Sequence, residues 1–161
     1  MITDFITGDA TYIGGSDGDN EGTWTWLDGE PFTYSKWGES EPNGNDTENC
    51  LEITYSMDWN DIYCGGQDYK YYICETPLSK LFLLFITCQQ PILNSESTDF
   101  FHNFILGLCP DSWYYYDQNC WYFADAEVES VPWKAAQDIC HSGSEFAHII
   151  SIHDDKVQYI Q

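Results

Sequence analysis

Hydrophobic positions divide the chain into three zones that differ in their spacing. In residues 1–75, short apolar or alternating runs such as TYIGG, WTWL, NCLEITY and YYICE are separated by Gly, Asp and Asn. Short runs bounded by turn-forming residues are typical of short strands. This zone is therefore predicted to consist of short strands joined by long loops.

Residues 109–161 combine a strand pattern with a helix pattern. The segment CPDSWYYYDQNCWYF predicts a strand–turn–strand unit with its turn at residues 117–119. In the following VPWKAAQDICHS, Pro132 suits a first helical turn. Helical spacing in this segment relates Val131, Ala135, Ala136 and Ile139. A second, weaker helix is expected to start in HDDKVQYIQ, with an Asp at its cap.

Residues 76–108 fit neither neighbouring zone. They contain LFLLFITC, an unbroken and mainly apolar run of eight residues that follows Lys80. A membrane-spanning helix needs about 20 apolar residues, so this run is too short to cross a bilayer. The zone is interpreted as a gene-model fusion or translated intron, as a real linker, or as the apolar region of a signal peptide stranded within the chain.

The charge of the chain excludes some classes of partner. Acidic residues outnumber Lys plus Arg by 27 to 5, and the formal net charge is −22 over 161 residues. Such a surface repels phosphate backbones and anionic membranes, which argues against nucleic-acid binding. Because aromatic residues make up 17% of the chain and lie among the acids, the composition favours a folded extracellular module over a disordered tail.

Seven cysteines favour disulfides in an oxidising compartment over a metal centre. None stands in a CxxC pair, so a zinc ribbon or a thioredoxin-type site is not supported. Buried thiols of a cytosolic protein are the alternative. The start of the chain, MITDFITGDATYIGG, has no basic segment followed by an apolar one, so we expect the true N-terminus of a secreted protein to be missing here.

Motifs in residues 12–75 resemble the C-terminal half of a C-type lectin-like domain. YIGG occupies the place of that family's W-I-G-L strand, and WTWLDGEPFTYSKWGESEPN follows its long-loop pattern. WND at residues 59–61 then precedes Cys64 and Cys74, as in the family. The resemblance implies an α+β fold with two helices, short antiparallel strands and a long calcium-binding loop.

Residues 109–152 resemble the N-terminal half of the same fold, through a cysteine hairpin, a helix ending at Cys140 and the stretch GSEFAHIISIH. The halves therefore come in permuted order. The division is 1–75 for the C-terminal half, 76–108 for an apolar linker or non-native insert, and 109–161 for the N-terminal half. A truncated tandem of lectin domains, a circular permutant and a swapped homodimer are the alternatives.

The resemblance also implies a disulfide pattern. Cys50 is expected to pair with Cys64, and Cys109 with Cys120. The third bridge, between Cys74 and Cys140, would join the two halves. Cys88 in the middle zone is then left over.

The loop ESEPNGNDTENC, at residues 39–50, is rich in the oxygen ligands that a hard cation prefers. Glu41 and Asn43 flank Pro42, and a cis peptide bond before Pro42 would turn both side chains toward one point. The candidate ligands for calcium and sugar are Glu41, Asn43, Glu48, Asn60 and Asp61. By resemblance, Glu-Pro-Asn implies calcium-dependent binding of mannose, fucose or N-acetylglucosamine, whereas Gln-Pro-Asp is found in galactose binders.

A second calcium site is suggested by Asp17 and Glu21, which match early ligands of the family, with Glu48 shared between the sites. Two positions that are usually acidic in the family are Gly44 and Asn49 here. Ordinary solvated loop acids are the alternative interpretation of this group.

Glycans or glycoproteins are the expected partners, and the expected location is extracellular. The alternatives are a lectin-fold module that binds protein without sugar, and a non-functional gene-model fragment. A hydrolase is disfavoured because no nucleophile–base pair or closed His cluster is evident. His148 and His153 are interpreted as a strand end and a helix cap, and most tryptophans as core and loop anchors. The glycosylation triplet at residues 45–47 is expected to be unoccupied if the loop binds sugar.

Overall fold

The computed structural model describes residues 10–66, 70–78, 109–116, 118–124 and 131–154. Cys88, the apolar run before it and most of the predicted second helix lie outside these residues. The elements are β1 (Thr11–Ser16), β2 (Thr25–Trp26), the 3-10 helix η1 (Asn45–Thr47), β3 (Cys50–Ile53), β4 (Trp59–Ile62), β5 (Tyr71–Pro77), β6 (Tyr114–Tyr116), β7 (Asn119–Phe123), α4 (Trp133–Gly143) and β8 (His148–Ile149).

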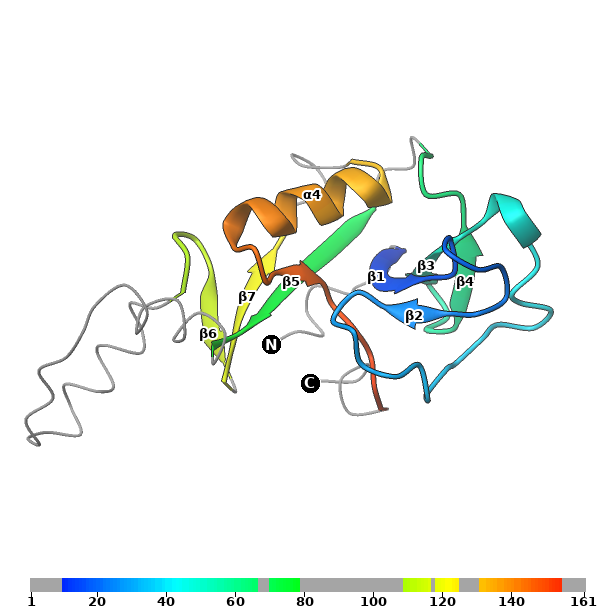
Figure 1. The fold of residues 1–161 in the computed structure, drawn as a ribbon, viewed down its shortest axis with the longest axis horizontal. Helices are drawn as coiled ribbons and strands as arrows, with labels where there is room; N and C mark the ends of the chain where they lie inside the picture. Colours follow the sequence, from blue (N-terminus) through cyan, green and yellow to red (C-terminus); the bar gives the residue numbers. More distant parts are fainter. Residues whose placement is uncertain (1–9, 67–69, 79–108, 117, 125–130, 155–161) are drawn as a thin grey trace, which may run out of the picture.

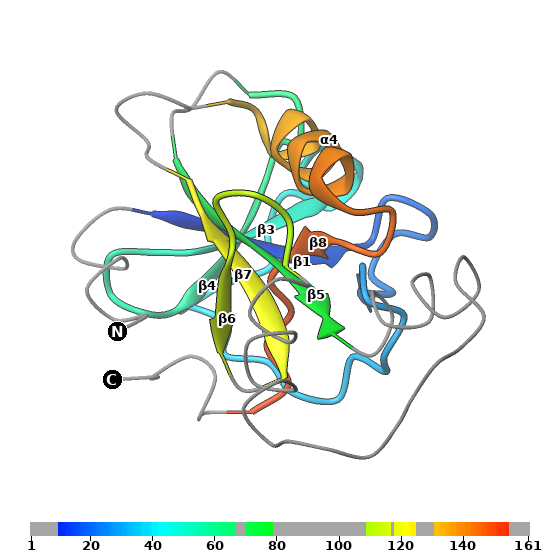
Figure 2. The same ribbon diagram turned by 90° about the vertical axis from the view of Figure 1, so that its left-hand side faces the viewer.

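The strands form one mixed sheet with the order β4-β3-β1-β5-β7-β6, to which β2 is added on β1 and β8 on β5. Helix α4 lies along the sheet near β5 and β8 (Figures 1 and 2). The expected α+β class is confirmed; the described residues contain the α-helix α4 together with short strands. β1 and β5 run parallel, whereas the other pairs of named strands in the described part of the chain are antiparallel.

Strand β5 links two parts of the chain, namely the described residues before 79 and those from 109 onward. It pairs with β1 of the first part on one side, and with β7 and β8 of the second part on the other. The Trp133 indole N–H donates to the carbonyl of Ile13 at 2.9 Å, and this hydrogen bond is buried. Gly14 N–H donates to the carbonyl of Ile150 at 2.8 Å. The described residues between 10 and 78 and those between 109 and 154 therefore share one sheet and one core. That they are the permuted halves of one domain stays a prediction.

The core is continuous across these two parts. Ile13, Leu51 and Ile149 are fully buried and belong to the same hydrophobic cluster. β1 approaches the segment around β8 so closely that a Cβ at Gly14 would overlap the carbonyl oxygen of Ile149. Glycine is therefore required at this contact for steric reasons, and a larger residue would separate the two parts of the chain.

Three disulfides have the predicted pairing: Cys50–Cys64, Cys74–Cys140 and Cys109–Cys120, with Cα–Cα distances of 5.2, 5.3 and 5.5 Å. The second of them links β5 to α4 and therefore fastens the two described parts of the chain covalently within one molecule. The swapped homodimer stays a prediction.

The predicted hairpin and helix are both present. β6 and β7 pair across the turn near Gln118, whose φ is +65°. α4 begins directly after Pro132 and buries Trp133, Ala136 and Cys140. All seven tryptophans of the chain pack in or against the core; these are Trp24, Trp26, Trp37, Trp59, Trp113, Trp121 and Trp133.

Candidate functional site

The long loop is anchored to β4 around Trp59. Gly38 N–H donates to the Trp59 carbonyl at 2.9 Å, and Trp59 N–H donates to the Lys36 carbonyl at 2.7 Å. The Trp59 ring is fully buried and packs edge-on against the rings of Trp26, Phe32, Tyr34 and Trp37. This aromatic packing places the residues after Trp59 beside the loop, at the opposite end of the sheet from β6 (Figure 1).

Asp61 ties the loop to the sheet. Its side chain is 2% exposed, and its two carboxylate oxygens accept different main-chain N–H groups. Oδ1 accepts from Asn43 at 3.0 Å and Oδ2 from Gly44 at 2.8 Å. Each oxygen has two lone pairs, so these bonds leave acceptor capacity for a further ligand.

Glu41 and Asn43 lie together, as predicted. The Glu41–Pro42 peptide bond is cis. The Asn43 amide nitrogen donates to Glu41 Oε2 at 2.7 Å. Desolvation raises the pKa of Glu41, and the hydrogen bond to Asp61 and the negative charges of Asp61 and Glu48 raise it further. The three carboxyl groups are therefore close enough to repel one another when all are ionised.

Glu48 follows η1 and packs over Gly44. A Cβ built on Gly44 would overlap Glu48 Cβ, Cγ and Oε2. The absence of a side chain at position 44 therefore leaves the space in which the Glu48 carboxylate sits. Gly44 stands where the family usually has an acid, and the structure shows that this glycine makes room for the neighbouring acid Glu48.

Asn60 is placed differently from the other four candidates. It stands opposite Glu52 in the β3–β4 register, and its amide donates to Glu52 Oε1 at 3.0 Å. Glu52 also forms an ion pair with Lys70. Side chains alternate along a strand, so Asn60 and Asp61 project from opposite faces of β4. The structure brings together four of the candidates, Glu41, Asn43, Glu48 and Asp61. It turns Asn60 away from them, toward the ion pair of Glu52 and Lys70.

The second predicted site, formed by Asp17, Glu21 and Glu48, contains one buried oxygen without a partner among the described residues. Asp17 is 3% exposed; its Oδ2 accepts Gly22 N–H at 2.8 Å, while Oδ1 has no hydrogen-bond partner among the described residues. Asn49 Oδ1 is in the same situation. Desolvation raises the pKa of Glu21, and so do the negative charges of Asp17, Asp46 and Asp61. Sequence reasoning noted Asn49 as a position that is usually acidic in the family, but it did not include Asn49 among the candidate ligands.

The donor chemistry of both groups fits a hard cation. Carboxylate and amide oxygens predominate, and calcium takes about six to eight oxygen ligands. The unpartnered buried oxygen of Asp17 is the kind of acceptor that a cation would satisfy. Within the described residues, however, no three carboxylate, imidazole or thiol groups are already arranged to hold a metal ion. The residue types therefore fit calcium, while the coordination itself is not formed.

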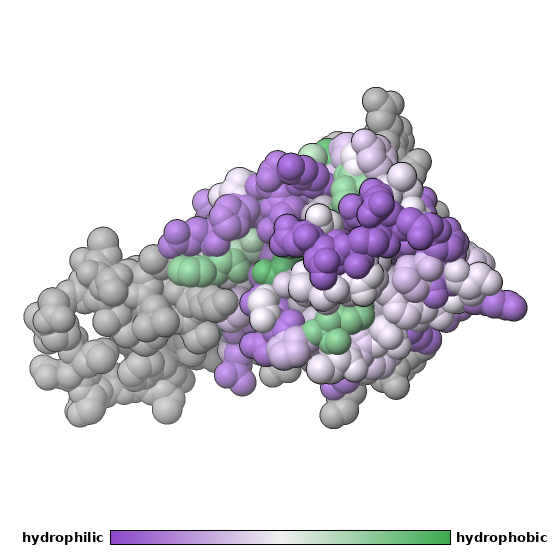
Figure 3. Space-filling view, turned by 45° about the vertical axis from the view of Figure 1, so that its right-hand side comes forward, coloured by the Kyte–Doolittle hydropathy of each residue, from purple (hydrophilic) through white to green (hydrophobic). Residues whose placement is uncertain are grey.

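The surface around this end of the molecule is mainly hydrophilic, with small hydrophobic patches (Figure 3). In the part of the chain that is described, no helix is long and apolar enough to cross a membrane. A polar face with acidic and amide groups is suited to ligands rich in hydroxyl groups.

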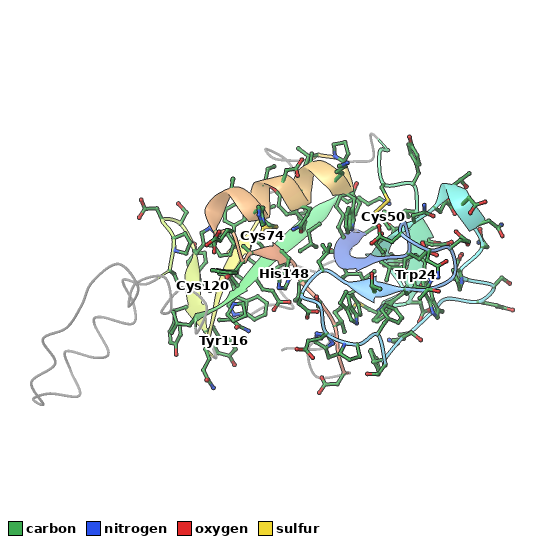
Figure 4. All side chains as sticks on the ribbon, in the orientation of Figure 1. Trp24, Cys50, Cys74, Tyr116, Cys120 and His148 are labelled. Atoms are coloured by element: carbon green, nitrogen blue, oxygen red, sulfur yellow. A yellow bond between two sulfur atoms is a disulfide. The ribbon has the colours of Figure 1, made fainter. Side chains whose placement is uncertain are left out.

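His148 and His153 make contacts that connect the two parts of the chain. His148 is in β8, as a strand residue, and its Nδ1 is 3.8 Å from Glu75 Oε1 (Figure 4). His153 Nε2 is 2.6 Å from Asp28 Oδ2. Burial raises the pKa of Glu75 to about 8, although this carboxyl accepts the N–H of Ser151. The helix expected to be capped near His153 lies outside the described residues.

Known proteins match this chain over less than half of its length. The chicken (Gallus gallus) hepatic lectin is 42% identical over 74 residues, which is 43% of this chain and 34% of that protein. Chicken mannose-binding protein is 44% identical over 64 residues, or 40% of this chain and 25% of that protein. The chain thus spans about a third or less of these relatives, which are named as lectins or binding proteins and not as enzymes.

Two solved structures are also similar to part of this chain. The carbohydrate-recognition domain of cow CD23, crystallised in the presence of GlcNAc2Man3 oligosaccharide, is 39% identical, with a TM-score of 0.35 over 37% of this chain and 47% of that chain. The mouse scavenger receptor C-type lectin domain is 32% identical, with a TM-score of 0.36 over 38% and 49%. The family model "Lectin C-type domain" matches residues 1–76, so the resemblance carried by the motifs of this part of the chain is confirmed.

Proposed function

We propose that this protein binds carbohydrate in a calcium-dependent manner, with a preference for mannose, fucose or N-acetylglucosamine. The observation that supports this most is the gathering of Glu41, Asn43, Glu48 and Asp61 at one loop. Three carboxylates and one amide lie there without a balancing cation among the described residues. The family match over residues 1–76 supports the same conclusion.

Glu41 and Asn43 supply complementary groups for a sugar. The Glu41 carboxylate accepts hydrogen bonds, whereas the Asn43 amide can donate them. Two neighbouring hydroxyls, one donating to Glu41 and one accepting from Asn43, would replace the 2.7 Å contact that these side chains make with each other. Calcium, when bound, would neutralise the carboxylates and take up the remaining hydroxyl oxygens. Asp61 holds the loop backbone in position for this arrangement.

Calcium is proposed at this loop, with Asn60 as a fifth ligand that must leave Glu52, and at the second site of Asp17, Glu21 and Glu48. The three disulfides favour an oxidising, extracellular location. Glycans or glycoproteins are the proposed partners. A lectin-fold module that binds protein without sugar is the alternative, and correct folding without calcium-dependent retention on sugar would favour it.

The test is retention on immobilised mannose and galactose of oxidised protein made without N-glycans. Retention on mannose should require calcium and be reversed by a chelator. Exchanging the acceptor and donor with Glu41→Gln and Asn43→Asp should move the preference toward galactose. Asp111→Asn, which changes an exposed acid in the 109–120 region, is the matched control. If the folded protein is not retained on mannose with calcium, the proposal is wrong.

A further inference from the structure

Asn45 belongs to the one Asn-x-Ser/Thr triplet of the chain, Asn45-Asp46-Thr47. We propose that Asn45 is an N-glycosylation site, and that a glycan attached there closes the neighbouring loop to other glycans. The sugar binding proposed above then belongs to molecules that lack this glycan, and the expectation of an unoccupied triplet applies to those molecules. The closing effect rests on the proposed function of that loop, whereas the acceptor role of Asn45 does not.

The triplet is accessible in the folded protein. It forms η1, which contains no buried residue. The Asn45 side-chain nitrogen donates to the Asn43 carbonyl at 3.2 Å, and the Thr47 hydroxyl donates to the Gly44 carbonyl at 2.6 Å; both hydrogen bonds are exposed. A glycosylated Asn keeps one N–H on this nitrogen, so the turn can retain its hydrogen bond after modification. An exposed turn in a disulfide-bonded chain is a suitable acceptor context.

The reaction needs a donor from the secretory pathway, an oligosaccharide linked through diphosphate to a polyisoprenoid lipid. A bond forms between Asn45 Nδ2 and C1 of the reducing-end sugar, and the bond from C1 to the diphosphate oxygen breaks. The diphosphate leaves with the bonding electron pair, and Nδ2 loses one proton. The three disulfides place the chain in the compartment type where this donor and its transferase act.

The attachment point lies next to the proposed ligands. Asn45 Nδ2 contacts the backbone of Asn43, whose own amide contacts Glu41 at 2.7 Å. The first sugar ring would therefore occupy the approach to these two side chains. The N-glycan core is uncharged and leaves the carboxylates of Glu41, Glu48 and Asp61 unmodified. Calcium binding should persist in the glycosylated protein while access for other glycans is lost.

The experiment uses the full chain secreted from eukaryotic cells. Four proteins are compared: wild type, Asn45→Gln, Thr47→Ala and the control Thr47→Ser, which keeps the triplet and the hydroxyl. Peptide mass should place a glycan on Asn45 in wild type and Thr47→Ser alone. These two should not be retained on mannose, whereas Asn45→Gln and Thr47→Ala should be retained at least tenfold better. The calcium-induced rise in melting temperature should be the same in wild type and Asn45→Gln.

Two results overturn the inference: secreted wild-type protein without a glycan on Asn45, or glycosylated protein retained as well as Asn45→Gln. A third result has a different meaning. If Asn45→Gln shows the calcium-induced rise in melting temperature but is not retained on mannose, sugar binding by the loop is refuted. The proposed closing of the loop to other glycans is then refuted as well. The peptide mass still decides the acceptor role of Asn45 in that case, so the two failures can be told apart.

Discussion

Replacing Asp61 with Asn tests whether one buried carboxylate both holds the loop and serves the proposed calcium site. Asp61 is 2% exposed and accepts one main-chain N–H on each oxygen, at 3.0 and 2.8 Å. An Asn side chain has one acceptor oxygen, and its amide N–H groups would face the other N–H donor. One hydrogen bond to a charged acceptor is therefore lost, and the second becomes a neutral one.

The expected loss of stability follows from these two bonds. A hydrogen bond to a charged group contributes about 1.5–3 kcal/mol. Removing the negative charge also relieves repulsion of Glu41 and Glu48, but this gain is below about 1 kcal/mol near the surface. The net change without calcium should be a destabilisation of about 2 kcal/mol. For a chain of this size it corresponds to a melting temperature lower by about 4–8 °C.

The assay is thermal and urea unfolding of wild type, Asp61→Asn and Asp111→Asn, with chelator and with calcium. At a calcium concentration of about 100 times Kd, the wild type should gain about 2.7 kcal/mol; a variant that binds about 100-fold more weakly should gain about 0.4 kcal/mol. Asp111→Asn should behave as wild type. If Asp61→Asn has the wild-type free energy of unfolding in chelator and gains as much stability from calcium as the wild type does, the role assigned to this carboxylate is incorrect.

Three further predictions concern other residues. Because burial raises the pKa of Glu75 from 4.5 to about 8, the folded state holds this proton more tightly than the unfolded state does. Stability should fall as the pH rises from 4.5 to 8, and Glu75→Gln should flatten this slope in pH-dependent urea unfolding. Gly44→Ala should displace Glu48, because the added Cβ would overlap Glu48 Cβ and Cγ, and should therefore lower the stability in chelator and also the gain in stability on adding calcium; an unchanged gain would contradict the packing. Replacing Cys74 and Cys140 by Ser should destabilise the protein by about 4 kcal/mol, since the bridge closes a sequence separation of 66 residues. Peptide mapping of the oxidised protein should recover these two cysteines linked, and finding both as free thiols would contradict the structure.

The local pattern of residues in the sequence was sufficient to predict several features of this protein. Alternation and turn residues indicated the β6–β7 hairpin, and helical spacing after Pro132 indicated α4. These features depend on interactions between residues close in sequence, which a pattern can represent. The disulfide pairing and the candidate ligands Glu41, Asn43, Glu48 and Asp61 came from the resemblance, because the motifs that carry it are themselves local.

Other features were decided by contacts between distant residues. The parallel pairing of β1 with β5 could not be predicted, since an apolar pattern carries no strand direction. The register of β3 against β4 turned Asn60 toward Glu52, although Asn60 and Asp61 are adjacent in sequence. The burial of Glu75 and the unpartnered oxygen of Asp17 also arise only when the sheet is assembled. The sequence by itself determined which oxygen ligands are available, whereas the tertiary structure determined which of them meet, because strand register and packing orient each side chain.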